Sequence, residues 1–78
     1  MTNLEKYNQA FVDALEIDES ELKGLNYKGV PSWDSVGHMS LVAAIEDAFD
    51  IEIATDDIID ISSYEKGKEI LKKYDVEI

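Results

Sequence analysis

The sequence predicts an all-α fold, a four-helix bundle with a long first loop and a short third helix. Two segments, at about residues 3–15 and 35–49, carry apolar side chains three and four positions apart, which is typical of amphipathic helices. Residues 16–34 between them contain Gly24, Gly29 and Pro31 and have no such period. With 78 residues the chain is expected to form one domain over residues 1–78.

The first helix is predicted over about residues 3–15. Thr2 and Glu5 have the spacing of a capping box, which satisfies two backbone N–H groups at a helix start. Its apolar positions are Leu4, Tyr7, Phe11, Ala14 and Leu15. The apolar residues in segment 16–34 are scattered, so we expect a long loop that packs by its own side chains and delivers the next helix.

The second helix is predicted over about residues 35–49, with Asp34 as its N-cap. Its predicted core stripe consists of Leu41, Val42, Ile45, Ala48 and Phe49. Near Ser35 the outward positions are also weakly apolar, namely Val36, Met39, Ala43 and Ala44. Small and flexible apolar side chains suit transient docking to several partners. The alternative is a helix that is buried nearly all round.

Two shorter helices are predicted in the last third of the chain. Thr55 opens a short helix through Asp60, and its isoleucines Ile58, Ile59 and Ile61 are expected in the core. Ser62 and Glu65 have capping-box spacing and open the last helix. The inner face of that helix is predicted to consist of Tyr64, Gly67, Ile70, Leu71 and Tyr74.

Acidic residues dominate the composition, and the formal net charge is -11. This charge argues against nucleic acid or an anionic membrane as a partner and favours basic protein surfaces. No lysine or arginine lies between Lys28 and Lys66. The acids in that window are Asp34, Glu46, Asp47, Asp50, Glu52, Asp56, Asp57, Asp60 and Glu65. A solvated surface is enough to explain such a run of acids. A run this one-sided should also steer basic partners toward the segment that carries Ser35.

Location and metal chemistry follow from what the composition lacks. There is no cysteine, so the chain has neither a disulfide nor a cysteine-based metal site. No basic start followed by an apolar run indicates a secretory signal, so we expect a cytoplasmic protein. We also expect it to be a monomer. The acids do not fit the twelve-residue calcium loop of an EF-hand, which leaves at most weak, diffuse binding of divalent cations and no metal site.

Ser35 is the candidate functional residue. At a helix N-terminus its hydroxyl lies in a field that favours phosphate, although helix capping alone also explains an Asp-Ser pair there. Asp34, Ser35 and His38 are the residue types of a hydrolase triad, but a bundle of this size offers no evident cleft or oxyanion hole. We therefore predict no enzyme activity and no catalytic residue, and we expect His38 to be a surface or partner-contact residue.

Three motifs resemble the acyl carrier protein family. The tripeptide Asp34-Ser35-Val36 is similar to the family's Asp-Ser-Leu signature, residues 46–53 (EDAFDIEI) look like the acidic end of its second helix, and residues 61–64 (ISSY) resemble the entry to its last helix. The resemblance implies that a phosphopantetheinyl transferase attaches the 4'-phosphopantetheine of coenzyme A to Ser35. The thiol of that group then carries acyl or aminoacyl thioesters between enzymes of a lipid or secondary-metabolite pathway.

The resemblance also suggests which residues meet partners. Asp34, Val36 and Met39 border the expected contact with the transferase, and Glu46, Asp47 and Asp50 extend it. An acyl-loading ligase or transferase and downstream enzymes with basic docking surfaces are the other expected partners.

The sequence also departs from the family's pattern. Where carriers of fatty acid biosynthesis have Asp-Thr-Val-Glu after the signature, this chain has residues 37–40 (GHMS), and Ala48 replaces an acid. These departures favour a specialised, free-standing carrier. The competing class is an unmodified acidic helical protein–protein interaction module, in which Ser35 only takes part in a cap.

Overall fold

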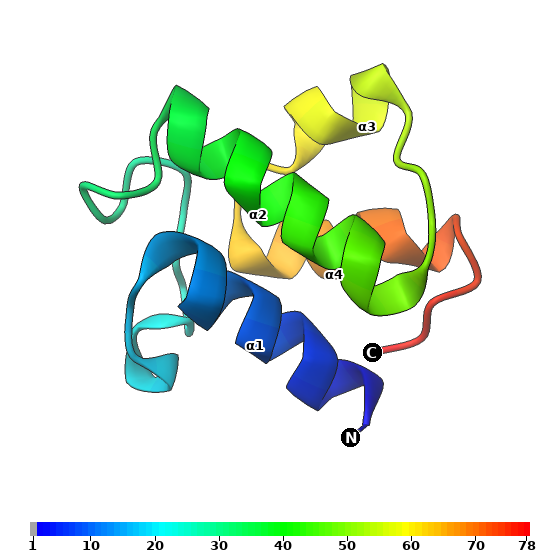
Figure 1. The fold of residues 1–78 in the computed structure, drawn as a ribbon, viewed down its shortest axis with the longest axis horizontal. Coiled ribbons are helices and arrows are strands. Elements are labelled where there is room, and N and C mark those ends of the chain that lie inside the picture. The colour runs from blue at the N-terminus through cyan, green and yellow to red at the C-terminus, as the bar shows by residue number, and fades with distance from the viewer. Residues whose placement is uncertain (1) are drawn as a thin grey trace.

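The computed structural model describes residues 2–78, which form four α-helices and no β-strand. The helices are α1 (Asn3–Leu15), α2 (Ser35–Phe49), α3 (Thr55–Asp60) and α4 (Tyr64–Lys72), with a short 3-10 helix, η1 (Glu19–Glu21), between α1 and α2. Figure 1 shows α1 and α2 side by side and the two chain ends near each other. The predicted all-α class is confirmed. No helix within residues 2–78 combines the length and the apolar character needed to cross a bilayer.

The start of α1 has the predicted capping box. Glu5 N–H donates to Thr2 Oγ1 at 3.1 Å, and Thr2 N–H donates to Glu5 Oε1 at 2.9 Å. The helix stops at Glu16, which adopts a left-handed conformation (φ 54°) and returns its N–H to the carbonyl of Val12. Between these ends, Tyr7 and Phe11 point into the core with no exposed surface.

Segment 16–34 packs by its own side chains, as expected. Leu22, Leu25 and Trp33 are buried, and Trp33 is fully enclosed. Two backbone hydrogen bonds attach the segment to the start of α4. Tyr27 N–H donates to the carbonyl of Ser62 at 2.8 Å, and Tyr64 N–H donates to the carbonyl of Leu25 at 2.9 Å. The segment is therefore fixed at a point well before it reaches α2.

The cap of α4 differs from the prediction. Ser63, and not Ser62, accepts a hydrogen bond at its Oγ, from Lys66 N–H at 3.0 Å. Ser62 instead offers its carbonyl to Tyr27 across the loop. Two neighbouring serines are equally good caps by residue type, and the bond to the loop decides which of them precedes the helix.

Aromatic side chains fill the centre of the molecule. The rings of Tyr7, Phe11, Trp33 and Tyr64 lie within 5.0 to 5.5 Å of a neighbour in the group, mostly edge to face. Tyr7 donates its hydroxyl to the carbonyl of Tyr64 at 2.6 Å, and burial raises the pKa of this phenol well above its usual range. A Cβ at Gly67 would overlap that hydroxyl, so the core requires glycine there.

One expectation about the core is wrong, that for Ile59, and the one for Phe49 holds in part, because Phe49 packs against the core without being fully buried. Ile61 is buried and Ile58 is half-buried, but Ile59 is 73% exposed. Since α3 has only six residues and covers the core with one face, Ile59 lies a third of a turn away from that face. Phe49, at the last residue of α2, is half-buried, whereas Leu41, Val42 and Ile45 of the same stripe are buried.

Candidate functional site

The start of α2 holds Ser35 at the surface. Asp34 is the N-cap, and its Oδ1 accepts a hydrogen bond from Gly37 N–H at 2.9 Å. The carbonyl of Asp34 accepts the N–H of His38 at 2.8 Å. Ser35 is therefore the first residue of a 15-residue helix, with an exposed side chain. The free N–H groups and the positive end of the helix dipole favour a phosphate at this position.

Gly37 allows the preceding loop to pass close to α2. A Cβ at this position would overlap the carbonyl oxygen of Ser32. Further back, Lys28 N–H donates to the carbonyl of Trp33 at 3.1 Å, and Trp33 N–H donates to the carbonyl of Val30 at 3.1 Å. These bonds close the loop on itself, so it approaches Ser35 along one defined path.

His38 is an internal connector, which corrects the expectation of a surface or partner-contact residue. The Trp33 indole Nε1–H donates to His38 Nδ1 at 3.0 Å. On the other side of the ring, His38 Nε2 lies 2.7 Å from the carbonyl oxygen of Ile58. The imidazole is half-buried and lies nearly parallel to the indole, with the planes 15° apart. It thus links the loop, α2 and α3.

An apolar groove of about 430 Å³ adjoins Ser35, and we call it the Ser35 groove. It is lined by Ser35, His38 and Met39 of α2, by Ile58 and Ile59 of α3, and by Tyr27 and Ser62 from the flanking segments. The groove is open to solvent and lies over a core whose centre is filled by aromatic rings.

Apolar side chains are exposed around the same place. Val36 is 77% exposed and Met39 is 57% exposed, one turn apart on α2. Ile59 of α3 is 73% exposed and lines the same groove as Met39. The alternative of an α2 buried all round is therefore wrong at its N-terminal end. An exposed apolar patch of this kind is typical of a surface that other proteins contact.

The predicted acidic contact residues lie at the other end of α2. Asp47 and Asp50 are exposed, and Asp50 is the left-handed C-cap of the helix (φ 52°). Glu46 is half-buried, and its Oε2 accepts the backbone N–H of Ile53 at 2.8 Å, so this carboxylate holds the turn after α2. At about 1.5 Å per residue, Asp47 is about 18 Å along the helix from Ser35. The two sets of predicted contact residues therefore form two separate surfaces.

Asp34, Ser35 and His38 are not arranged as a Ser-His-Asp triad. Both ring nitrogens of His38 are bonded, to Trp33 and to Ile58, and the carboxylate of Asp34 bonds Gly37 N–H. In this arrangement the imidazole has no free nitrogen to take the Ser35 proton, and Asp34 does not orient it.

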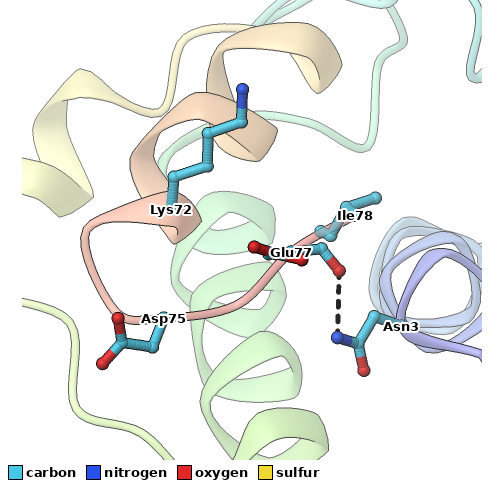
Figure 2. Close-up of a pocket in the computed structure, with 5 residues that line it drawn as sticks. All are labelled: Asn3, Lys72, Asp75, Glu77 and Ile78. Carbon is cyan, nitrogen blue, oxygen red and sulfur yellow. Dashed lines mark hydrogen bonds between the residues drawn. The ribbon is translucent and has the colours of Figure 1, made fainter.

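A second depression, of about 660 Å³, lies at the opposite end of the molecule beside the chain termini (Figure 2). Its lining includes Asn3, whose Nδ2 donates to the carbonyl of Glu77 at 2.9 Å. Figure 2 shows the Lys72 and Asp75 side chains pointing away from that bond rather than toward a common centre. We find no convergent set of polar groups here that would define a binding site.

Within residues 2–78 there is no group of three or more His, Asp or Glu side chains placed to hold a metal ion. Comparisons of the chain with protein-family models, with curated proteins and with solved structures find no match.

Trp33, Gly37 and Ile58 shape the site, and none of them was predicted to do so. Trp33 is the only tryptophan, and its buried indole N–H needs an acceptor, which the histidine five residues later supplies. That pairing could have been suspected from the sequence. Gly37 and Ile58 could not, because their roles depend on the path of the loop and on the position of α3.

Proposed function

We propose that this chain is a free-standing carrier protein of the acyl carrier type, a four-helix bundle with a long first loop and a short third helix. A phosphopantetheinyl transferase attaches 4'-phosphopantetheine to Ser35. The observation that carries the proposal is the exposed Ser35 hydroxyl at the capped start of α2, directly beside an apolar groove. A carrier needs this combination of an accessible attachment point and a neighbouring surface for docking.

The attachment step forms a phosphodiester. The Ser35 oxygen attacks the coenzyme A phosphorus that bears the pantetheine, the pyrophosphate bond breaks, and adenosine 3',5'-bisphosphate leaves. The transferase supplies the metal and the base that takes the hydroxyl proton, so Ser35 has only to be exposed and held in place. When bound, the group supplies a thiol that carries acyl or aminoacyl groups as thioesters.

The residues around Ser35 fit this group. The N-terminal field of α2 suits the phosphate, and the apolar walls formed by Met39, Ile58 and Ile59 suit the arm. Because the arm tethers its cargo, each enzyme that docks the carrier meets that cargo at a high effective concentration. The proposed contacts for partners with basic and apolar surfaces are all exposed, namely Val36, Met39, Asp47 and Asp50.

The proposed setting is a cytoplasmic lipid or secondary-metabolite pathway. The partners are the transferase, an acyl-loading ligase or transferase, and downstream enzymes. The carrier acts as a monomer, and neither nucleic acid nor membrane is a partner, in keeping with the net charge of -11.

The decisive experiment is the intact mass of the protein after co-expression with a broad-specificity phosphopantetheinyl transferase. We expect the parent to gain one phosphopantetheine and Ser35→Ala to gain none. Ser62→Ala is the matched control, because Ser62 lines the same groove and is also exposed. A parent without the added mass, or Ser35→Ala with it, would contradict the proposal.

The competing function is an unmodified acidic interaction module. The bond from Gly37 to Asp34 favours it, since that bond explains the Asp-Ser pair without any modification. In this case a partner binds equally well to the parent and to Ser35→Ala, because the substitution leaves the acidic surface intact, and the intact mass is that of the bare chain.

A further inference from the structure

His38 joins three separate parts of the molecule at the Ser35 groove. Its Nδ1 accepts from the indole of Trp33 at 3.0 Å, and its Nε2 lies 2.7 Å from the carbonyl oxygen of Ile58. Trp33 belongs to the loop before α2, and Ile58 belongs to α3, which forms the far wall of the groove. The shape of the groove therefore depends on both of these bonds.

One protonation state of His38 satisfies both bonds. An indole N–H can only donate, so Nδ1 must present its lone pair to Trp33. The single ring proton of the neutral imidazole must then be on Nε2, which donates it to Ile58. An imidazolium carries protons on both nitrogens and cannot accept from Trp33. Since Trp33 has no exposed surface, its N–H would then be buried without an acceptor.

We propose that His38 is a positioning residue that holds Trp33 against the first turns of α2 only while its imidazole is neutral. Protonation breaks the bond to Trp33, while Nε2 still donates to the carbonyl of Ile58. His38 and α3 are then no longer tied to the loop, so the Ser35 groove changes shape with pH. The consequence for modification of Ser35 rests on the carrier function proposed above. We call the pH-dependent link from Trp33 through His38 to Ile58 the His38 lock. The lock does not depend on the carrier function, because it concerns only hydrogen bonds within the chain.

The charged and titratable groups around His38 come from the loop, from α2 and from α3. On the loop side Tyr27 meets the imidazole edge to face at 5.6 Å, and Lys28 lies over the Tyr27 ring. Asp34 precedes His38 by one turn on α2. On α3 the acids beside Ile58 are Asp56, Asp57 and Asp60, and Asp57 bonds Lys73 and Tyr74.

Carboxyl groups titrate below the imidazole range, and phenol and ammonium groups titrate above it. The chain has one histidine and no cysteine. The protonation of the His38 ring can therefore be followed separately from that of the other side chains.

Nitrogen-15 NMR of the single histidine and the single tryptophan tests the lock directly. We expect the Nε2–H tautomer at about pH 8 and an indole N–H resonance typical of a hydrogen bond. As the pH falls to about 5, the indole resonance and the backbone amides of Ile58 and Ile59 should shift with the same midpoint as the ring nitrogens. An Nδ1–H tautomer at the higher pH, or an indole resonance that does not follow the imidazole, would overturn the proposal.

Two substitutions test the bond of His38 to Trp33 and its bond to Ile58 one at a time. His38→Asn keeps an acceptor near the position of Nδ1. His38→Gln keeps a donor near the position of Nε2. Neither amide side chain changes its protonation with pH in these experiments. We expect the indole resonance to stay at its bonded position at every pH in His38→Asn. In His38→Gln the Ile58 amide should be insensitive to pH. If the indole shift persists in His38→Asn, another group causes it and the proposal is wrong.

The consequence for Ser35 is measured as the rate of phosphopantetheine attachment to the parent divided by the rate for His38→Asn. The ratio removes the pH dependence of the transferase. Between about pH 7.5 and 5.5 we expect the ratio to fall by about two- to tenfold, the effect of losing one ordinary hydrogen bond. A constant ratio overturns the effect on Ser35. If the parent is not modified at any pH, the carrier proposal fails, and the NMR spectra still decide whether the lock exists.

Discussion

At Gly37 a single hydrogen atom in place of a side chain sets the geometry of the site. The carbonyl of Ser32 occupies the space that a Cβ would need, and the N–H of Gly37 bonds the Asp34 cap. Asp34 was predictable as the cap because capping depends on neighbours along the chain. The role of Gly37 was not, because the loop brings Ser32 there through contacts that are distant in sequence.

We therefore expect Gly37→Ala to destabilise the protein by about 1–3 kcal/mol, the usual cost of forcing an extra carbon into a packed site. Urea denaturation of the parent and the variant measures the effect. Ser40→Ala is the control, because Ser40 is exposed on the same helix, and it should stay within about 0.5 kcal/mol of the parent. Equal midpoints for the parent and Gly37→Ala would show that the loop is free to move away from α2.

At the scale of elements, α3 is held at both of its ends by side chains. Near its end, His38 bonds the carbonyl of Ile58. At its start, the Tyr74 hydroxyl donates to Asp57 Oδ2 at 2.6 Å and accepts the N–H of Ala54 at 2.8 Å, and Lys73 Nζ lies 2.9 Å from Asp57 Oδ1. A helix of six residues gains little stability by itself, so these bonds determine its position.

The bonds from Tyr74 and Lys73 hold the pKa of the Asp57 carboxyl below its ordinary value. A group whose pKa is lower in the folded state stabilises the fold above the pKa of the unfolded chain. That contribution disappears as the pH falls through the lower, folded value. The stabilisation by Asp57 is therefore complete at neutral pH and is lost below about pH 4.

The corresponding measurement compares the unfolding free energy of the parent and of Asp57→Asn from about pH 7 to pH 3. The parent should be the more stable protein at neutral pH, and the difference should shrink toward zero at the acid end. Asp56→Asn, an exposed change in the same turn, should show no such convergence. A difference that stays constant with pH would mean that the carboxylate charge of Asp57 is not what holds α3.

The bounds of α1 and α2 follow from caps and apolar periods, which are local signals, and they agree with the prediction. The exposure of Ile59 and the choice of Ser63 as the cap depend on where other segments lie, and both predictions about them were wrong. In the site, exposed Ser35 was predictable, whereas the link from Trp33 through His38 to Ile58 was not.

Across the whole molecule, negative charge is concentrated on the part that contains α2 and α3. The ion pairs found in residues 2–78 all use lysines from the last part of the chain, namely Lys66, Lys68 and Lys73. Of these, Lys73 is the one that pairs with an acid on another helix, Asp57 of α3. The remaining acids of α2 and α3 therefore repel one another in the folded state, and the same charge attracts basic partners.

Screening of this repulsion should raise the melting temperature. At about 0.01 M salt the Debye length is about 30 Å, so charges interact across a molecule that measures 30 × 27 × 19 Å. At about 0.15 M it is about 8 Å, and only close neighbours still interact. If screening relieves about 1 kcal/mol, the melting temperature of a domain of this length rises by about 4–8 °C between these conditions.

Calorimetry in NaCl, and in MgCl₂ at equal ionic strength, tests this expectation and its cause. If screening is the cause, the two salts should raise the melting temperature equally, because within residues 2–78 no cluster of carboxylates is placed to hold a metal. Neutralising two exposed acids in Asp47→Asn/Asp50→Asn should raise the melting temperature at low salt and flatten its dependence on salt. A parent protein that melts at the same temperature in both dilute and physiological salt would rule out self-repulsion as a significant term.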